Sequence, residues 1–173
     1  MSTERIDIEL VDEGGEVKGL AEKYEVHKNP VPLHRAVSVV IVDESSEKML
    51  IQQRAGDKST WPLFWSNAVC THPLPKEEFK TAAERRLREE LGFSVPLQEV
   101  FRFTYQAEYD KTWGENEYDV VFLGKYGGDV RPDHREVSDF KWVDIGELKE
   151  DVKENPDLFS PWFKIILEKL NIV

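Results

Sequence analysis

A nearly continuous run of apolar, β-branched residues follows Arg35, with the sequence AVSVVIV. Such a run is typical of a strand that is buried on both faces of a sheet, because both faces then contact apolar partners. The polar segment DESSEK comes next and is followed by a second apolar segment, MLIQQR. We therefore expect a hairpin at the centre of a sheet.

Shorter alternating segments lie on both sides of this hairpin. Residues 5–11 alternate loosely between polar and apolar, the segment EGGE at 13–16 supplies a turn, and a second extended piece begins near Val17. This pattern predicts an opening hairpin. Three further strands are expected at residues 99–107, 118–125 and 139–143.

A helical period marks residues 76–91. Its apolar stripe recurs at close to 3.6 residues and consists of Phe79, Ala83, Leu87 and Leu91. Gly92 then suits a left-handed helix cap. Glu90 projects from nearly the same side as the stripe, where a carboxylate is costly unless it is paired or binds a metal. The tail SPWFKIILEKL predicts a packed amphipathic helix. The whole order of elements predicts an α+β fold or an αβα layered sheet, in which residues 1–173 form a single domain.

Charge and composition narrow the function classes. The chain has 23 Lys+Arg and 34 Asp+Glu, a net charge of −11, which disfavours binding to nucleic acid or to an anionic membrane. Apolar segments stop well short of the ~18 residues of a membrane-spanning helix. The start, MSTERIDIEL, lacks the order of a secretory signal, so we expect a cytoplasmic protein. Cys70 is the one cysteine, which excludes an intrachain disulfide.

Histidines and glutamates together suggest a metal site. Three of the four histidines lie in segments that flank the proposed core: His27, His34 and His72. The fourth, His134, is interpreted as an ordinary polar residue. Glu115 and Glu117 in WGENEYD share one face of an extended chain, where their charges repel unless a cation binds. A solvated acidic loop is the alternative. Imidazole mixed with carboxylate suits a divalent transition ion.

Cys70 lies two residues before His72 in AVCTHP. If this stretch is extended, the thiol and the imidazole face the same cavity. A thiol beside a metal and a cationic pocket exchanges its proton near neutral pH more readily than an isolated one. The alternative is that Cys70 serves as a small buried apolar side chain.

The helical segment also carries a resemblance. Its end, REELGF, resembles the end of a Nudix box, whose helix uses glutamates to hold Mg²⁺ against a diphosphate. The positions that match are Glu77, Arg85, Glu89, Glu90 and Gly92. Two depart from the box: Thr71 replaces its opening glycine, and Arg86 replaces the glutamate after the arginine. The resemblance implies a Nudix-like αβα sandwich with a mixed central sheet, and the departures weigh against hydrolysis.

A wider set of segments resembles the type I isopentenyl-diphosphate Δ-isomerases in order and approximate spacing over residues 23–162. These segments are KYEVH, LHRA, QQRAGDKSTWP, FWSNAVCTHP, RRLREELGF, FTYQA, GENEYD and FSPW. The resemblance implies an isomerase that interconverts isopentenyl and dimethylallyl diphosphate in isoprenoid biosynthesis. Its partner is then a small prenyl diphosphate, and the protein is a monomer or a homodimer.

The resemblance also implies roles for single residues. It makes the metal ligands His27, His34, His72, Glu115 and Glu117. It makes Cys70 and Glu117 the catalytic pair, with Tyr105 near the acidic group and Trp162 over the hydrocarbon end. It places Glu90 on a Mg²⁺ ion that binds the diphosphate, surrounded by Lys23, Arg54, Lys58 and Arg86. The ion of the His/Glu site is expected to be Mn²⁺ or Mg²⁺, with Zn²⁺ as an alternative.

The double-bond shift itself requires residues of these types, independently of the resemblance. Moving a double bond requires one proton delivered and one removed, which a thiol and a carboxylate can supply. The tertiary cation formed on the way would be attracted by the face of Trp162, for which plain core packing is the alternative. Arg86 has an alternative use in an i, i+4 salt bridge with Glu90. Two other functions remain open: a Nudix diphosphohydrolase, and a non-enzymatic module that binds metal or prenyl diphosphate.

Overall fold

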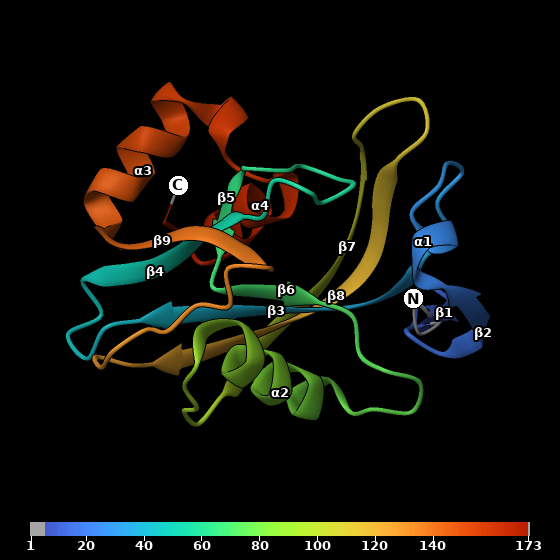
Figure 1. The fold of residues 1–173 in the computed structure, drawn as a ribbon, viewed down its shortest axis with the longest axis horizontal. Helices are drawn as coiled ribbons and strands as arrows, with labels where there is room; N and C mark the ends of the chain where they lie inside the picture. The colour runs from blue at the N-terminus through green and yellow to red at the C-terminus, as the bar shows by residue number, and fades with distance from the viewer. Residues whose placement is uncertain (1–5, 173) are drawn as a thin grey trace.

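The computed structural model describes residues 6–172, whose strands join in one mixed nine-stranded sheet with helices on both faces (Figure 1). The strands are β1 (Asp7–Val11), β2 (Val17–Glu22), β3 (His34–Val42), β4 (Lys48–Arg54), β5 (Trp65–Asn67), β6 (Val69–Thr71), β7 (Gln98–Glu108), β8 (Gly114–Lys125) and β9 (Val137–Asp144). The helices are α1 (Lys23–Val26), α2 (Phe79–Leu91), α3 (Ile145–Glu154) and α4 (Pro161–Lys169), with a 3₁₀ turn at Pro156–Leu158. The predicted α+β arrangement is confirmed; Arg5, in the first predicted strand, lies outside the described residues.

The central strand is β3, as the apolar run predicts. All nine of its residues are buried, and it pairs with β1, β4, β6 and β8, of which β8 runs parallel to it. The expected hairpin with β4 forms only at its turn, where Ile41 pairs with Leu50 and Val42 with Met49. Beyond these pairs the two strands diverge: β6 pairs with β3 and β5 pairs with β4. The fork places Cys70 of β6 opposite Ser38 of β3.

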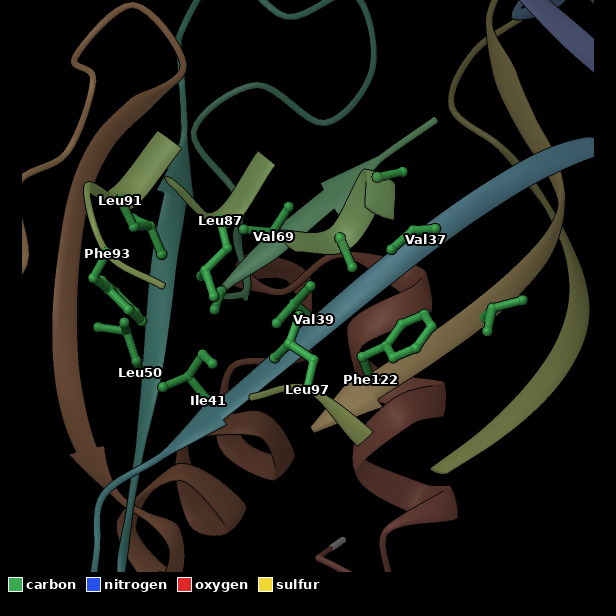
Figure 2. Close-up of a cluster of buried hydrophobic side chains, with 14 of the residues drawn as sticks. Val37, Val39, Ile41, Leu50, Val69, Leu87, Leu91, Phe93, Leu97 and Phe122 are labelled. Carbon is green, nitrogen blue, oxygen red and sulfur yellow. The ribbon is translucent and has the colours of Figure 1, made fainter. Parts of the chain in front are cut away.

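Each face of the sheet carries its own apolar cluster. On one face, α2 packs Leu87 and Leu91 against Val39 and Ile41 of β3, as Figure 2 shows. On the other face, α3 and α4 cover alternate β3 residues such as Val40. Because β3 serves both clusters, the two halves of the core share one strand. No helix among residues 6–172 is long and apolar enough to cross a membrane.

Two element boundaries differ from the expectation by three residues or more. Helix α2 begins at Phe79 and not at residue 76, because Lys76 has a left-handed φ of 66° and Glu78 is the N-cap. Strand β8 begins at Gly114, four residues before the expected start at residue 118. A Cβ at Gly114 would lie 2.7 Å from the carbonyl oxygen of Ala107, so only glycine allows β7 and β8 to pair this closely here.

A buried ion pair ties the first hairpin to the rest of the fold. The guanidinium of Arg35 donates to the Glu9 carboxylate and, at 3.0 Å, to the carbonyl oxygen of Glu77. The second oxygen of Glu9 accepts from the backbone N–H of Lys76 at 3.0 Å. These bonds join β1 to β3 and to the segment before α2. They hold in place the hairpin from which Lys23 and His27 follow.

Candidate active site

A cavity of about 300 Å³ opens where the fork between β3 and β4 meets the segment after β2. Its wall contains all but one of the residues to which the isomerase resemblance gives a metal, catalytic or diphosphate role: Lys23, His27, Arg54, Lys58, Cys70, His72, Arg86, Glu90, Tyr105, Glu115, Glu117 and Trp162. His34 is the exception, because it is fully buried behind the wall. The structure therefore brings together segments that are more than 130 positions apart in the chain.

Five residues form what we call the inner cluster: His27, His34, His72, Glu115 and Glu117. One nitrogen or oxygen atom from each lies within 4.8 Å of those of the others. Nε2 of His27 is 3.1 Å from Nε2 of His72 and 3.2 Å from Oε2 of Glu115. The two glutamates share a face of β8, as their spacing predicts, and His134 has no part in the cluster.

Backbone carbonyls orient all three imidazoles. Nδ1 of His27 bonds to the carbonyl of Lys23 at 2.6 Å, Nδ1 of His34 to that of Pro32 at 2.8 Å, and Nδ1 of His72 to that of Arg35 at 3.0 Å. A carbonyl oxygen only accepts, so each Nδ1 carries the proton. In the neutral rings, Nε2 then points into the cluster as a lone pair, which is the arrangement of metal-ligating histidines.

The inner cluster therefore fits a divalent metal ion. Nε2 of His34 and Oε2 of Glu115 are buried and have no hydrogen-bond partner among the described residues. Buried acceptors that face one another are costly unless a cation lies between them. Burial and the neighbouring imidazoles lower the pKa of His72 well below its usual value, so it stays neutral, as a ligand must. Burial opposes charge on His27, but Glu115 outweighs it and raises the pKa of His27.

Cys70 has a dry, hydrogen-bonded surrounding. Its Sγ accepts from the indole N–H of Trp162 at 2.9 Å and donates to Oδ1 of Asn67 at 3.1 Å, with the hydroxyl of Ser66 at 3.4 Å. Burial raises the pKa of Cys70 to about 12. Burial outweighs the hydrogen bond with Ser66 and the charge of Arg54, so the residues alone favour the protonated thiol. Easier proton exchange by Cys70 beside a bound metal ion stays a prediction. Cys70 faces the cavity as a thiol.

Glu117 and Tyr105 form a second hydrogen-bonded pair in the wall. The phenol of Tyr105 donates to Oε2 of Glu117 at 2.6 Å. Burial and the charge of Glu115 raise the pKa of Glu117, and burial raises that of Tyr105 well above its usual value. Tyr105 therefore remains a proton-bearing donor beside a carboxyl group that gains a proton more readily than usual.

Trp162 combines packing with a position in the cavity wall. It is 3% exposed and belongs to the cluster beneath α3 and α4, where its ring lies 5.6 Å from that of Trp61. Its indole N–H is shared between Cys70 and the hydroxyl of Ser66, each at 2.9 Å. The guanidinium of Arg54 lies 5.0 Å from its ring centroid. Core packing and a role in the cavity are therefore compatible.

Charged residues at the other end of the cavity form what we call the outer cluster: Lys23, Lys58, Arg86, Glu90 and Glu136. Arg86 donates to Oε1 of Glu90 at 2.6 Å, so the i, i+4 pair that was the alternative use of Arg86 does form. Gln52 donates to the second oxygen of Glu90 at 3.2 Å. Burial and the nearby Lys58 lower the pKa of Lys23. Arg54 stands apart, donating to the carbonyls of Thr60 and Trp61.

The structure adds residues that the sequence analysis does not single out. Thr60 donates to Oε1 of Glu115 at 2.9 Å and thereby fixes an inner-cluster carboxylate. Asn67 accepts from the thiol, and its amide donates to the carbonyl of Val39, bridging the fork. Asp119 is buried on the same face of β8 as Glu117, which the continued alternation of WGENEYD predicts. No sequence signal identifies Glu136, because its partner Lys58 is 78 residues away.

Comparison with known proteins agrees with this geometry. The NUDIX domain family matches residues 32–163. Among solved structures, a Deinococcus radiodurans protein has a TM-score of 0.70 at 17% identity, covering 86% of this chain and 90% of that one. A MutT protein from Methanosarcina mazei has a TM-score of 0.66 at 18% identity, covering 81% and 94%. The fold and the site together define a Nudix domain, as the resemblance implied.

Curated relatives indicate which family of Nudix proteins the chain belongs to. An isopentenyl-diphosphate Delta-isomerase from Aromatoleum aromaticum is 40% identical over 93% of this chain and 90% of its own length. Another, from Nocardia farcinica, is 40% identical over 93% and 92%. The chain belongs to the isopentenyl-diphosphate Delta-isomerase family. Membership implies dependence on a divalent metal, for which the inner cluster offers ligands.

Proposed function

We propose that this chain is an isomerase that interconverts isopentenyl diphosphate and dimethylallyl diphosphate in isoprenoid biosynthesis. One observation carries the proposal: the wall of a single cavity holds the Cys70 thiol and the Glu117 carboxyl group, together with a cluster that fits a metal ion and a cluster with three cationic side chains. Relatives that carry the isomerase name align with nearly the whole chain, which supports it.

The reaction is a balanced exchange of two protons. The electron pair of the C3–C4 double bond takes one proton and forms a new C4–H bond, which leaves a tertiary cation at C3. Loss of a proton from C2 then returns an electron pair and forms the C2–C3 double bond. Cys70 and Glu117 are the two groups that exchange these protons, and a positioned group of this kind typically contributes ~10² to 10⁴ in rate.

Two neighbours of the pair have supporting roles. Tyr105 holds the Glu117 carboxyl through its 2.6 Å hydrogen bond, which restricts that group to one orientation. Trp162 holds the Cys70 sulfur through its N–H and covers the hydrocarbon end of the substrate, where its ring attracts the cation. The Arg54 guanidinium already lies against this ring, so the cation competes with a positive neighbour.

Two ions complete the proposed site. The five residues of the inner cluster hold one ion, Mn²⁺ or Mg²⁺, with Zn²⁺ as the alternative. A bound ion there supplies positive charge beside the Glu117 carboxyl group. Glu90 holds a Mg²⁺ ion on the diphosphate, whose oxygens are bound by Lys23, Arg54, Lys58 and Arg86. The long, charged side chains of this set suit a diphosphate because charge-assisted hydrogen bonds are the strong ones.

The proposal also covers the domain organisation, location and partners of the chain. Residues 1–173 act as one domain in the cytoplasm, as a monomer or a homodimer, without nucleic acid or membrane as partner. A sheet that is shared by both apolar clusters supports the single domain. A Nudix diphosphohydrolase is less well supported, because Arg86 occupies a box position of a glutamate and pairs with Glu90.

Product analysis tests the proposal. The purified protein is incubated with isopentenyl diphosphate and Mg²⁺, and proton and phosphorus NMR follow the mixture. Dimethylallyl diphosphate is the expected product. Free phosphate would show a hydrolase, and unchanged substrate would show a module that only binds; either result would overturn the proposed function. Cys70→Ala serves as the matched control, because it leaves both charged clusters in place.

A further inference from the structure

One carboxylate in the cavity wall has no part in the proposed reaction. Glu136 lies immediately before β9, and its Oε2 pairs with Nζ of Lys58 and lies 3.5 Å from Nη2 of Arg86. Its side chain is 32% exposed and lines the cavity. Glu136 thus binds two of the side chains that are proposed to bind the diphosphate.

The backbone fixes Glu136 in this position. The N–H of Ala55 donates to the carbonyl of Glu136 at 3.1 Å, and the N–H of Glu136 donates to the carbonyl of Asp133 at 2.9 Å. The first bond joins the residue after β4 to the residue before β9. Because these two bonds anchor its main chain, Glu136 can change its rotamer but stays in the cavity wall.

The charge of Glu136 changes the electrostatic balance of the outer cluster. Burial raises the pKa of Glu136, but Lys58, Arg86 and Lys23 outweigh burial and lower it, so the group stays ionised at neutral pH. With all five of its groups charged, the outer cluster sets three cations against two carboxylates, which leaves one positive charge. Arg54, the fourth side chain of the proposed diphosphate site, lies outside this count. A diphosphate brings two or three negative charges. Arriving alone, it would compete with Glu136 for Lys58 and Arg86 and would face both carboxylates.

We propose that Glu136 is the counter-charge that makes diphosphate binding at this site depend on Mg²⁺. It competes with the diphosphate for Lys58 and Arg86, and its repulsion is offset only when a divalent cation binds together with the anion. Without Glu136 the outer cluster would carry two positive charges in excess, enough to hold a diphosphate without the ion. This inference rests on the proposed function, because it takes the outer cluster as the diphosphate site.

Calorimetry with inorganic pyrophosphate tests the role of Glu136, with and without added Mg²⁺. Glu136→Gln and Glu136→Met remove the charge at similar length, whereas Glu136→Asp keeps it. Glu84→Gln, which removes a carboxylate on α2 that is 41% exposed and pairs with Lys80, is the matched control. The neutral variants are expected to bind pyrophosphate about tenfold more tightly without Mg²⁺ and within about threefold of the parent with it. In Glu136→Asp and in the control variant, the ratio of the pyrophosphate affinities with and without Mg²⁺ is expected to equal that of the parent protein.

Each other outcome overturns the inference in a distinguishable way. An unchanged ratio of the two affinities in a neutral variant that melts within a few degrees of the parent would show that Glu136 is only structural. Weaker binding confined to the Mg²⁺ arm would show that Glu136 is a ligand of the ion. If the parent protein itself bound no pyrophosphate with Mg²⁺ present, the diphosphate site would fail, and the proposed function with it.

Discussion

The two ends of the cavity satisfy their polar groups in opposite ways. In the inner cluster, backbone carbonyls fix the histidine rings, and buried acceptors such as Nε2 of His34 have no hydrogen-bond partner among the described residues. In the outer cluster, Arg86 is paired with Glu90, and Lys58 with Glu136. The inner end presents ready lone pairs, whereas the outer end presents ion pairs that must open or rearrange.

This difference predicts two kinds of metal binding. A site whose ligands are already oriented by buried bonds loses little side-chain freedom when an ion binds, so it holds the ion tightly. In the outer cluster, the cationic side chains are already paired with carboxylates and must exchange them for phosphate oxygens. The Mg²⁺ ion of this cluster therefore arrives with the substrate. The cavity therefore joins a resident ion at one end to an exchangeable ion at the other, and Cys70 lines the same cavity.

Removing one ligand from each end should have the largest effect on metal binding. His72→Ala is expected to weaken the resident ion more than the ~10- to 100-fold that loss of a residue supporting a ligand typically costs. Glu90→Gln should leave this ion in place and weaken only the Mg²⁺-dependent binding of pyrophosphate. Elemental analysis after dialysis measures the first effect, with His134→Ala as the control. A full complement of metal in the His72 variant would remove that residue from the ligand set.

Substituting Cys70 should leave both ends intact while turnover is lost. Cys70→Ala and Cys70→Ser are expected to reduce turnover at least about a hundredfold, because a placed proton-exchanging group contributes ~10² to 10⁴. Metal content and pyrophosphate binding should stay at parent values. Steady-state rates with isopentenyl diphosphate provide the measurement. More than about a tenth of the rate in the serine variant would make the thiol a packing residue.

The pH dependence of its reactivity tests whether the Cys70 thiol is as buried as the structure shows. With a pKa of about 12, the Cys70 thiolate is scarce below pH 10, and its fraction rises tenfold with each pH unit. A thiolate of high pKa is intrinsically more nucleophilic, which offsets part of the loss in thiolate fraction. We therefore expect Cys70 to be alkylated at pH 8 about fiftyfold more slowly than an unburied thiol. Iodoacetamide and mass spectrometry follow the single cysteine. A plateau in rate below pH 9 would contradict the raised pKa.

The smallest expected effect concerns the support of the inner cluster. Thr60→Val removes the hydroxyl that donates to Oε1 of Glu115 and keeps the size of the side chain. Affinity for the resident ion should fall about tenfold, the lower end of the range for such supporting partners. Competition with a fluorescent chelator measures this affinity. Ser45→Ala, which removes an exposed hydroxyl in the turn before β4, should leave it unchanged.

Long elements and local motifs were predictable from the sequence. The apolar run of β3 and the stripe of α2 have clear periods, and the spacing of Glu115 and Glu117 places both on one face. Strands β5 and β6 have three residues each, too few to show a period. Helix α3 was missed although Asp144 caps it by accepting from the N–H groups of Gly146 and Glu147.

Partners from distant segments could not be predicted from local pattern. Glu136 contacts Lys58 across 78 positions, and Arg35 contacts Glu9 across 26. The raised pKa of Cys70 follows from burial in the fork, which only the divergence of β3 from β4 creates. In each case the side chain's chemistry was visible in the sequence, while its surroundings depended on the fold.

Isomerisation in D₂O tests the central claim most directly. The protein is incubated with isopentenyl diphosphate and Mg²⁺ in D₂O, and NMR locates deuterium in substrate and product. The account predicts dimethylallyl diphosphate that carries deuterium in the methyl group formed from C4, and no such product from Cys70→Ala. Dimethylallyl diphosphate without deuterium in that methyl group at early times would contradict proton exchange through Cys70 and Glu117.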